Sequence, residues 1–453
     1  MNRIPSDGVS RHHRIPASDA GGVGDFENRN APKRGRVDRA RHAGTAGTRT
    51  TVLPSGVTIV SERIASVRSV SLGFWFDVGS RDEPPEYNGI AHFIEHAVFK
   101  GTEKRKTHHI ARYLETVGGY VNAFTAKDAT CFYARVLDRH LPRAMDLLSD
   151  LILHPAFAER ELEKERRVVE EEIRSIGDDP EDYIHDEFEL LLFGQHPLAR
   201  TVIGPYENLP AFTAEALRSF IRREYTTGNL VVAAAGNLEH ERLVDLCSAA
   251  LDTLPRGERR VRTRPGTHAP RNRTLARPVQ QTHLLMGTRV PGLRSRTCDA
   301  LVLLNTLLGE GMGSRLFQRV REQHGYTYNI FSFLTQYEDV GVFGVYMSAD
   351  NGRVDRCRDI IRRELDDLST RPVSRRELAR TREQVIGGIL LGLESMNARM
   401  SRLGKDMLVF GRVLEVDEVI ARLEAVTAED ILHAAETACD HASYSSVTIV
   451  PVR

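Results

Sequence analysis

The order of secondary-structure signals repeats once along the chain, and this repetition constrains the fold more than any other feature. Thr213-Ala-Glu-Ala-Leu217 and Thr427-Ala-Glu-Asp-Ile431 lie 214 positions apart, and both are helix starts of capping-box type followed by an apolar strand. Other elements match at about that offset: strand 70–78 with 281–290, hairpin 120–137 with 326–347, helix 139–153 with 353–369, and helix 159–176 with 374–391. We therefore predict an α+β fold of two homologous α/β half-domains, each a mixed, mainly antiparallel sheet packed with helices. The alternative is an accidental resemblance between two α/β domains.

The repeat divides the chain into a first half at residues 49–253 and a second half at 281–453, joined by a basic, Pro-containing linker at 254–280. Residues 1–48 are rich in Gly, Pro, Arg, Ser and Asn without a hydrophobic period, so we expect a disordered tail there. A mitochondrial presequence is the rival interpretation, because the tail is Arg-rich. Such peptides are poor in acids, and the tail carries several: Asp7, Asp19, Asp25, Glu27 and Asp38.

Composition excludes several classes of protein. The 62 Lys and Arg balance 62 Asp and Glu, so no overall charge favours nucleic acid or an anionic membrane. No apolar run reaches the length of a membrane span, and the N-terminus lacks an apolar signal-peptide core. The five cysteines are scattered and form no C-x-x-C pair, which favours buried thiols in a reducing compartment. We expect a cytoplasmic protein.

The segment His92-Phe-Ile-Glu95-His96 carries the strongest chemical signal. It follows a turn-rich loop at 79–87, and Asn88 is a plausible N-cap for a helix over the motif. On a helix, residues four apart lie on one face, so His92 and His96 can offer two imidazoles to one metal ion. Glu95 stands beside them, and the pattern is H-x-x-E-H, the reverse of the commoner zinc motif. A surface helix with two exposed histidines is the alternative, and a third ligand would decide between the two.

The acidic helix at 159–176 can supply that ligand. Glu165 and Glu172 are seven residues apart, two helical turns, so they share one face and either could reach a metal if this helix packs against the motif helix. For most acids of this helix we expect an ordinary solvated face. The second half has the apolar stretch 299–308 where the first has its motif, so only one half can bind zinc in this way.

From about residue 51 to its end, the chain closely resembles the pitrilysin-type (inverzincin, peptidase family M16) zinc metallopeptidases, nearest to the mitochondrial processing peptidase and its bacterial relatives. The resemblance rests on the zinc motif with its downstream glutamates and on further segments in the family's order: Asn88-Gly89, Phe99-Lys-Gly-Thr102, Gly118-Gly119-x-x-Asn122-Ala-Phe-Thr125, Gly313-Ser-Arg-Leu-Phe317 and Arg321-Glu-x-x-Gly325-x-x-Tyr328. It implies one zinc ion per chain. His92, His96 and Glu172 would be the zinc ligands, Glu95 the general base, and Glu165 a supporting carboxylate.

The resemblance also assigns residues that meet the substrate. Arg321 and Tyr328 of the second half would reach across to the substrate and the developing oxyanion, and their alternative is a surface Arg and a half-buried strand Tyr. Strand 120–125 would bind an extended peptide at the edge of a sheet, through Asn122 and Ala123, with an ordinary hairpin strand as the alternative. Two acids four apart on the next helix would recognise an arginine before the cleaved bond, or form a solvated helix end: Asp182 and Asp186.

Two functions follow as expectations. The first is a zinc metalloendopeptidase that hydrolyses peptides or unfolded, presequence-like segments by Glu-assisted attack of a zinc-activated water. Its two halves would form half of a clamshell completed by a second copy of the chain, a homodimer, with a heterodimer containing an inactive paralogue as the other option. The second is a non-catalytic assembly subunit, as in the core proteins of respiratory complexes. Such relatives typically lose H-x-x-E-H, whereas this chain retains every ligand and the base.

Overall fold

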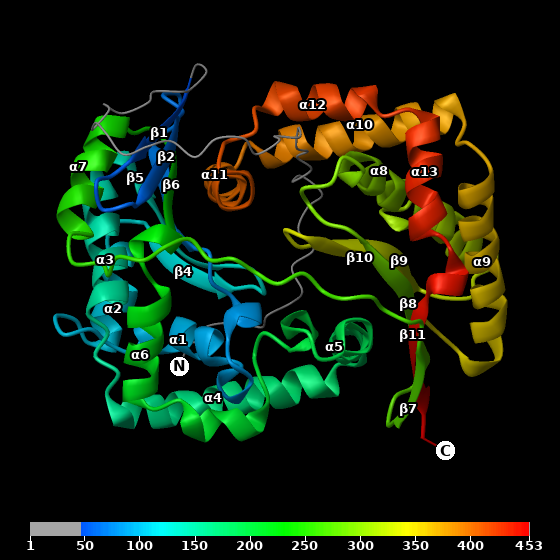
Figure 1. The fold of residues 1–453 in the computed structure, drawn as a ribbon, viewed down its shortest axis with the longest axis horizontal. Coiled ribbons are helices and arrows are strands. Elements are labelled where there is room, and N and C mark those ends of the chain that lie inside the picture. Colours follow the sequence, from blue (N-terminus) through cyan, green and yellow to red (C-terminus); the bar gives the residue numbers. More distant parts are fainter. Residues whose placement is uncertain (1–46, 453) are drawn as a thin grey trace.

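The computed structural model describes residues 47–452, and it places two sheets side by side, each covered by helices (Figure 1). The tail expected at residues 1–48 lies outside the described residues except for Gly47 and Thr48, and Thr48 already begins the first strand. Within residues 47–452, no helix is long and apolar enough to cross a membrane. All five cysteines are buried, as expected.

The first half contains a six-stranded sheet in the order β1-β2-β6-β3-β5-β4. The pair β2 and β6 is parallel, and every other neighbouring pair is antiparallel. The strands are β1 (Thr48–Val52), β2 (Thr58–Arg63), β3 (Ser69–Phe76), β4 (Tyr120–Thr125), β5 (Thr130–Leu137) and β6 (Leu230–Gly236). The helices are α1 (Ile90–Val98), α2 (Thr107–Glu115), α3 (Leu141–Leu153), α4 (Glu159–Asp178), α5 (Pro180–Phe193), α6 (Ala214–Glu224) and α7 (His240–Ala250).

The second half repeats this plan with a five-stranded sheet in the order β7-β11-β8-β10-β9, in which only β7 and β11 are parallel. Its strands are β7 (Asn272–Arg277), β8 (Thr282–Pro291), β9 (Asn329–Gln336), β10 (Val340–Ala349) and β11 (Ser445–Pro451). Its helices are α8 (Cys298–Gly309), α9 (Val354–Thr370), α10 (Arg375–Gly392), α11 (Met396–Phe410), α12 (Val416–Ala425) and α13 (Ala428–Ala438). The matching strand orders confirm the predicted α+β fold with two corresponding halves.

The expected linker needs a correction. Strand β7 lies inside the expected range 254–280 and pairs with β11 along its whole length, so it belongs to the second half. The sequence did not signal it because Asn272-Arg-Thr-Leu-Ala-Arg277 has few apolar residues and is mostly exposed. An edge strand of this kind is held by backbone hydrogen bonds rather than by a buried face. The connection between the halves therefore ends at Arg271.

The two helix starts that revealed the repeat are capped differently. Thr427 and Asp430 form a reciprocal capping box at α13. At α6 the Thr213 hydroxyl accepts the hydrogen of Ala216 N at 3.2 Å, but Ala216 has no side-chain acceptor to return the bond. Only the second start is therefore a full capping box, although both threonines cap their helices.

Each half covers the sheet face that is turned toward the other half with a helix of that other half (Figure 1). Helix α11 of the second half lies against β2, β3 and β6, and α5 of the first half lies against β8 and β11 (Figure 1). Trp75 on β3 packs with Met400 and Leu403 of α11, while Ile184 of α5 packs with Val447 of β11. Strand β3 is consequently buried on both faces.

Candidate metal centre

A buried carboxylate fixes the start of α1. Asn88 is not the N-cap that the sequence suggested, because the cap position is Gly89, whose φ of 99° favours glycine. Glu83 accepts hydrogen bonds from Gly89 N and Ala91 N, each at 2.7 Å, and from Asn88 Nδ2 at 2.9 Å. Burial raises the pKa of Glu83 to about 8, although these hydrogen bonds oppose the shift. Because the capping carboxylate comes from seven residues before the first helical residue, Ile90, the usual N-cap signal misses it.

The three expected ligands meet where α1 packs on α4. His92 and His96 lie on one face of α1 with ring centroids 4.7 Å apart. Glu172 Oε2 lies 3.8 Å from His92 Nε2 and 3.6 Å from His96 Nε2. In a tetrahedral zinc site with bonds near 2.0–2.1 Å, neighbouring ligand atoms are roughly 3.3 Å apart, so two imidazoles and a carboxylate at these separations fit zinc. Among the described residues this is the one such cluster of His, Cys, Asp or Glu.

The surroundings of His92 suit a metal ligand, since a ligand imidazole must be neutral. His92 is buried, with 6% of its surface exposed. Burial, together with the neighbouring His96, lowers the pKa of His92 to about 3. The ring is therefore neutral at ordinary pH and can offer a nitrogen to a cation.

Glu165 orients the second imidazole. His96 Nδ1 lies 2.8 Å from Glu165 Oε1, and because an ionised carboxylate only accepts, Nδ1 carries the hydrogen and Nε2 is left for a metal. Lys100 Nζ lies 2.7 Å from Glu165 Oε2. Burial alone would raise the pKa of Glu165, but the bonds from His96 and Lys100 lower it. Lys100 lies four residues after His96, just beyond the end of α1, and was not among the predicted site residues.

Glu95 is held by the edge strand of the sheet. The Thr125 hydroxyl donates to Glu95 Oε2 at 2.7 Å, so the end of β4 touches the expected general base. Burial raises the pKa of Glu95, and the Thr125 hydroxyl and backbone N–H oppose that shift. Thr125 was part of the resembling segment, but no sequence argument gave it a function. Its contact exists only because β4 and α1 pack together.

Strand β4 is the terminal strand of its sheet, as the peptide-binding expectation requires. Ala126 N donates to Ala129 O at 2.8 Å, so these two residues form a hydrogen-bonded pair of the hairpin. Hydrogen-bonded and non-hydrogen-bonded pairs alternate along antiparallel strands, so the backbone N–H and C=O groups of Val121, Ala123 and Thr125 point toward the free edge. Ala123 N donates to the side-chain oxygen of Asn122 at 2.9 Å. Asn122 and Ala123 therefore lie at the open edge, and Asn122 caps the N–H that a peptide would use.

Arg321 and Tyr328 lie together in the second half. Arg321 is in a π-helical turn at Phe317–Glu322, and its Nη1 donates to Tyr328 O at 3.1 Å. Tyr328 precedes β9 and is 86% exposed, so it is neither buried nor half-buried. In the described chain the Arg321 side chain contacts Tyr328, Phe317 and Glu322, all of the second half.

Asp182 and Asp186 lie in the first two turns of α5. With roughly 100° of rotation per residue, both lie on a different side of the helix from Ile184 and Phe188, which pack against the second sheet. Both aspartates are half-buried. The structure thus keeps them on one face, as expected, while their contact with a substrate stays a prediction.

The corresponding region of the second half is an apolar core. Helix α8 holds the place of α1 in the repeat, and Leu303 and Leu304 on it are fully buried. No His, Cys, Asp or Glu cluster with ligand spacing occurs there among residues 47–452. Among the described residues, the cluster with metal-ligand spacing therefore lies in the first half.

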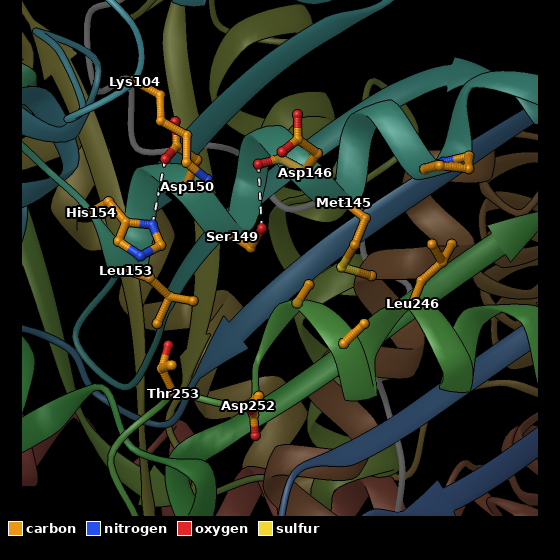
Figure 2. A pocket seen from close by; sticks show the side chains of 13 residues that line it. Lys104, Met145, Asp146, Ser149, Asp150, Leu153, His154, Leu246, Asp252 and Thr253 are labelled. Atoms are coloured by element: carbon orange, nitrogen blue, oxygen red, sulfur yellow. Dashed lines mark hydrogen bonds and ion pairs between the residues drawn. The ribbon is translucent and has the colours of Figure 1, made fainter.

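A surface cavity of about 380 Å³ lies elsewhere, between α3 and the end of α7 (Figure 2). Asp150 on its wall is buried, but its carboxylate already binds the Thr102 hydroxyl at 2.6 Å and the Arg105 guanidinium. His154 Nδ1 lies 3.4 Å from the same carboxylate, a contact drawn in Figure 2. None of the expected site residues lines this cavity.

Comparisons with known proteins agree with this geometry. The family model described as Insulinase (Peptidase family M16) matches residues 58–206, and the model described as Peptidase M16 inactive domain matches residues 211–385. An uncharacterized zinc protease of Streptomyces coelicolor is 41% identical over 404 residues, 86% of this chain and 86% of that protein. The uncharacterized zinc protease YmxG of Bacillus subtilis is 37% identical over 377 residues, 83% of this chain and 92% of that protein. A protease from Helicobacter pylori has the same fold, with a TM-score of 0.83 at 22% identity over 89% of this chain and 99% of that chain.

The first family match contains the whole metal centre, and the match described as inactive covers most of the half whose core is apolar at the corresponding place. Relatives named as zinc proteases match the chain across both halves. The similarity to these proteins therefore covers both halves of the fold, including the half that carries the expected metal ligands. The chain belongs to peptidase family M16, as a member with an intact H-x-x-E-H motif.

Proposed function

We propose that the protein is a zinc-dependent endopeptidase that cleaves peptides or unfolded segments. The observation that carries the proposal is the position of Glu95. It sits on the same helix as two zinc-compatible histidines, and it is hydrogen-bonded to the open edge strand on which a peptide can lie. Binding site, base and metal ligands thus converge from α1, α4 and β4. The alternative of a non-catalytic assembly subunit is not favoured, because the relatives are named zinc proteases.

The residues of the chain suggest how hydrolysis proceeds. When bound by His92, His96 and Glu172, zinc would supply a Lewis acid that lowers the pKa of a water and polarises the peptide carbonyl. Glu95, buried but held by Thr125, would take up the proton of the attacking water and deliver it to the leaving amine.

The edge of β4 would orient the substrate. An extended peptide can add to β4 through the outward backbone groups of Val121 and Ala123, which gives affinity with little sequence preference. The Asn122 side-chain oxygen now accepts a hydrogen bond from Ala123 N, and this bond would have to break before the N–H can bind a peptide.

Groups from the second half would complete the site. We assign donors for the developing oxyanion to Arg321, which is half-buried, and to Tyr328, whose high exposure leaves it available to a substrate. Since one chain would carry both the metal centre and these donors, a homodimer of identical chains is the assembly we propose. A heterodimer would be needed only if one of these parts had to come from another chain.

The decisive experiment compares wild type with Glu95→Gln. We expect about one zinc per chain in both proteins by mass spectrometry, and loss of peptide cleavage by about 10²–10⁴-fold in the variant, since a general base contributes that much. Glu103→Gln, an exposed change outside the site, serves as the control and should cleave normally. A wild-type protein that holds zinc but cleaves no peptide, as a homodimer or with added partners, would overturn the proposal.

A further inference from the structure

We propose that Thr125 is a positioning residue that holds the Glu95 carboxylate in its working orientation and couples it to the peptide-binding edge. The inference rests on the proposed peptidase function, since it concerns the base of that reaction. Thr125 is the last residue of β4, and its hydroxyl donates to Glu95 Oε2 at 2.7 Å. One residue therefore belongs to the edge strand and also contacts the base.

The backbone of Thr125 faces the same way. Thr125 pairs with Thr130 across the hairpin, next to the hydrogen-bonded pair of Ala126 and Ala129, so its N–H points away from β5. The hydroxyl contact to Glu95 and the outward N–H thus come from a single residue.

A hydrogen bond to one oxygen of a carboxylate restricts its rotation. A terminal carboxylate torsion is broad when nothing holds it, so a free Glu95 would sample many orientations. With Oε2 engaged by Thr125, Oε1 is left for the proton of an attacking water. Holding a catalytic group in a reactive geometry removes an entropic cost from the chemical step and leaves ground-state binding largely unchanged.

The bond also marks where the peptide-binding edge ends. Val121 and Ala123 direct backbone groups outward, and the next outward residue, Thr125, holds Glu95 through its hydroxyl. A peptide added along β4 would therefore reach the base one outward residue beyond Ala123.

A merely structural hydroxyl would behave differently. Thr125 is half-buried, and a role confined to satisfying a buried carboxylate would lower stability on removal without separating kcat from KM. A positioning role lowers kcat specifically, because the orientation matters in the transition state. The same hairpin offers a matched control, since Thr130 is buried directly opposite and its hydroxyl donates to Val78 O at 2.8 Å, away from Glu95.

The experiment compares Thr125→Val, Thr125→Ser and Thr130→Val with wild type, using zinc content, melting temperature, and kcat and KM on an extended fluorogenic peptide. We expect Thr125→Val to keep its zinc and to lose about 10- to 100-fold in kcat with KM within about threefold, a part of what a general base contributes. Thr125→Ser restores the hydroxyl and should recover most of kcat. Thr130→Val should retain kcat even if its melting temperature falls.

Wild-type kcat in Thr125→Val, or a rise in KM with unchanged kcat, would overturn the inference. So would an equal loss of kcat in Thr130→Val. Crystal structures of zinc-loaded wild type and Thr125→Val give a readout that does not need activity. The Glu95 carboxylate should occupy one orientation in wild type and several in the variant. If wild type cleaves nothing, the proposed function fails, while these structures still decide whether Thr125 fixes Glu95.

Discussion

Glu165 and Glu172 lie on one face of α4 but bind different partners at the metal centre. The sequence places both on one face of α4 and leaves either able to reach a metal. Packing separates them: Glu172 lies within 3.8 Å of both histidine Nε2 atoms, whereas Glu165 binds His96 Nδ1 and Lys100. The contacts of Lys100 and Thr125 were not predictable in this way, because a hydrogen bond between elements depends on how the elements pack. Helical spacing predicts which residues share a face, but not which atoms meet.

Removing the charge of Glu165 should weaken zinc binding. In Glu165→Gln the amide no longer provides an ionised acceptor for His96 Nδ1–H, so the tautomer that offers Nε2 is less favoured. We expect zinc affinity to fall about 10- to 100-fold, measured by competition with a chromogenic chelator. Glu171→Gln, on the exposed side of the same helix, should bind zinc as wild type does. Equal affinities for Glu165→Gln and Glu171→Gln would mean that Glu165 does not support the site.

At the level of elements, the apolar residues of α11 predict a buried helix but not the sheet that it covers. Met400 and Leu403 would serve equally well in the core of their own half. The structure instead packs them on Trp75, and the Trp75 indole donates to Met400 Sδ at 3.1 Å. The repeat itself was predictable, since the order of elements is local information. The exchange of α5 and α11 between the halves was not predictable from the sequence. The apolar side of each helix could cover a sheet of its own half or the sheet of the other half.

Gly404 makes this packing testable. A Cβ at Gly404 would lie 2.5 Å from the Trp75 ring, which is itself buried, so an alanine forces the helix or the indole to move. We expect Gly404→Ala to lower the free energy of unfolding by about 1–3 kcal/mol, the usual cost of overpacking, in chemical denaturation. Gly388→Ala on α10 is the control. Its Cβ meets nothing within 4 Å, so alanine should be neutral or stabilise by up to about 1 kcal/mol through helix propensity. A Gly404→Ala protein as stable as Gly388→Ala would show that α11 does not press on Trp75.

Across the whole molecule, the two halves are joined by more than the exchanged helices. Arg81 of the first half is buried and binds Asp128 at 2.9 Å and Asp339 of the second half at 3.1 Å. Arg262 of the connection binds Asp77 at 2.8 Å and Asp82 at 2.7 Å. Buried pairs of this kind are costly to break, because the charge left behind is uncompensated. The hairpin turns that follow β4 and β9 therefore meet at one fixed junction between the halves.

Because the halves contact each other in this way, we predict that they stay together in the folded protein after the peptide segment that joins them, which ends at Arg271, has been cut. Gly266 lies in an exposed stretch after Arg262 and before β7, and a specific protease site inserted there can be cut in the native protein. We expect the cut chain to elute as one body of unchanged size and to melt in a single transition close to that of the uncut protein, because α5 and α11 still hold each half to the other. Cutting the same protein after Gly404→Ala should lower the melting temperature further than either change alone. Elution of two separate fragments at micromolar concentration would show that the halves are held together by their connection and not by the exchanged helices.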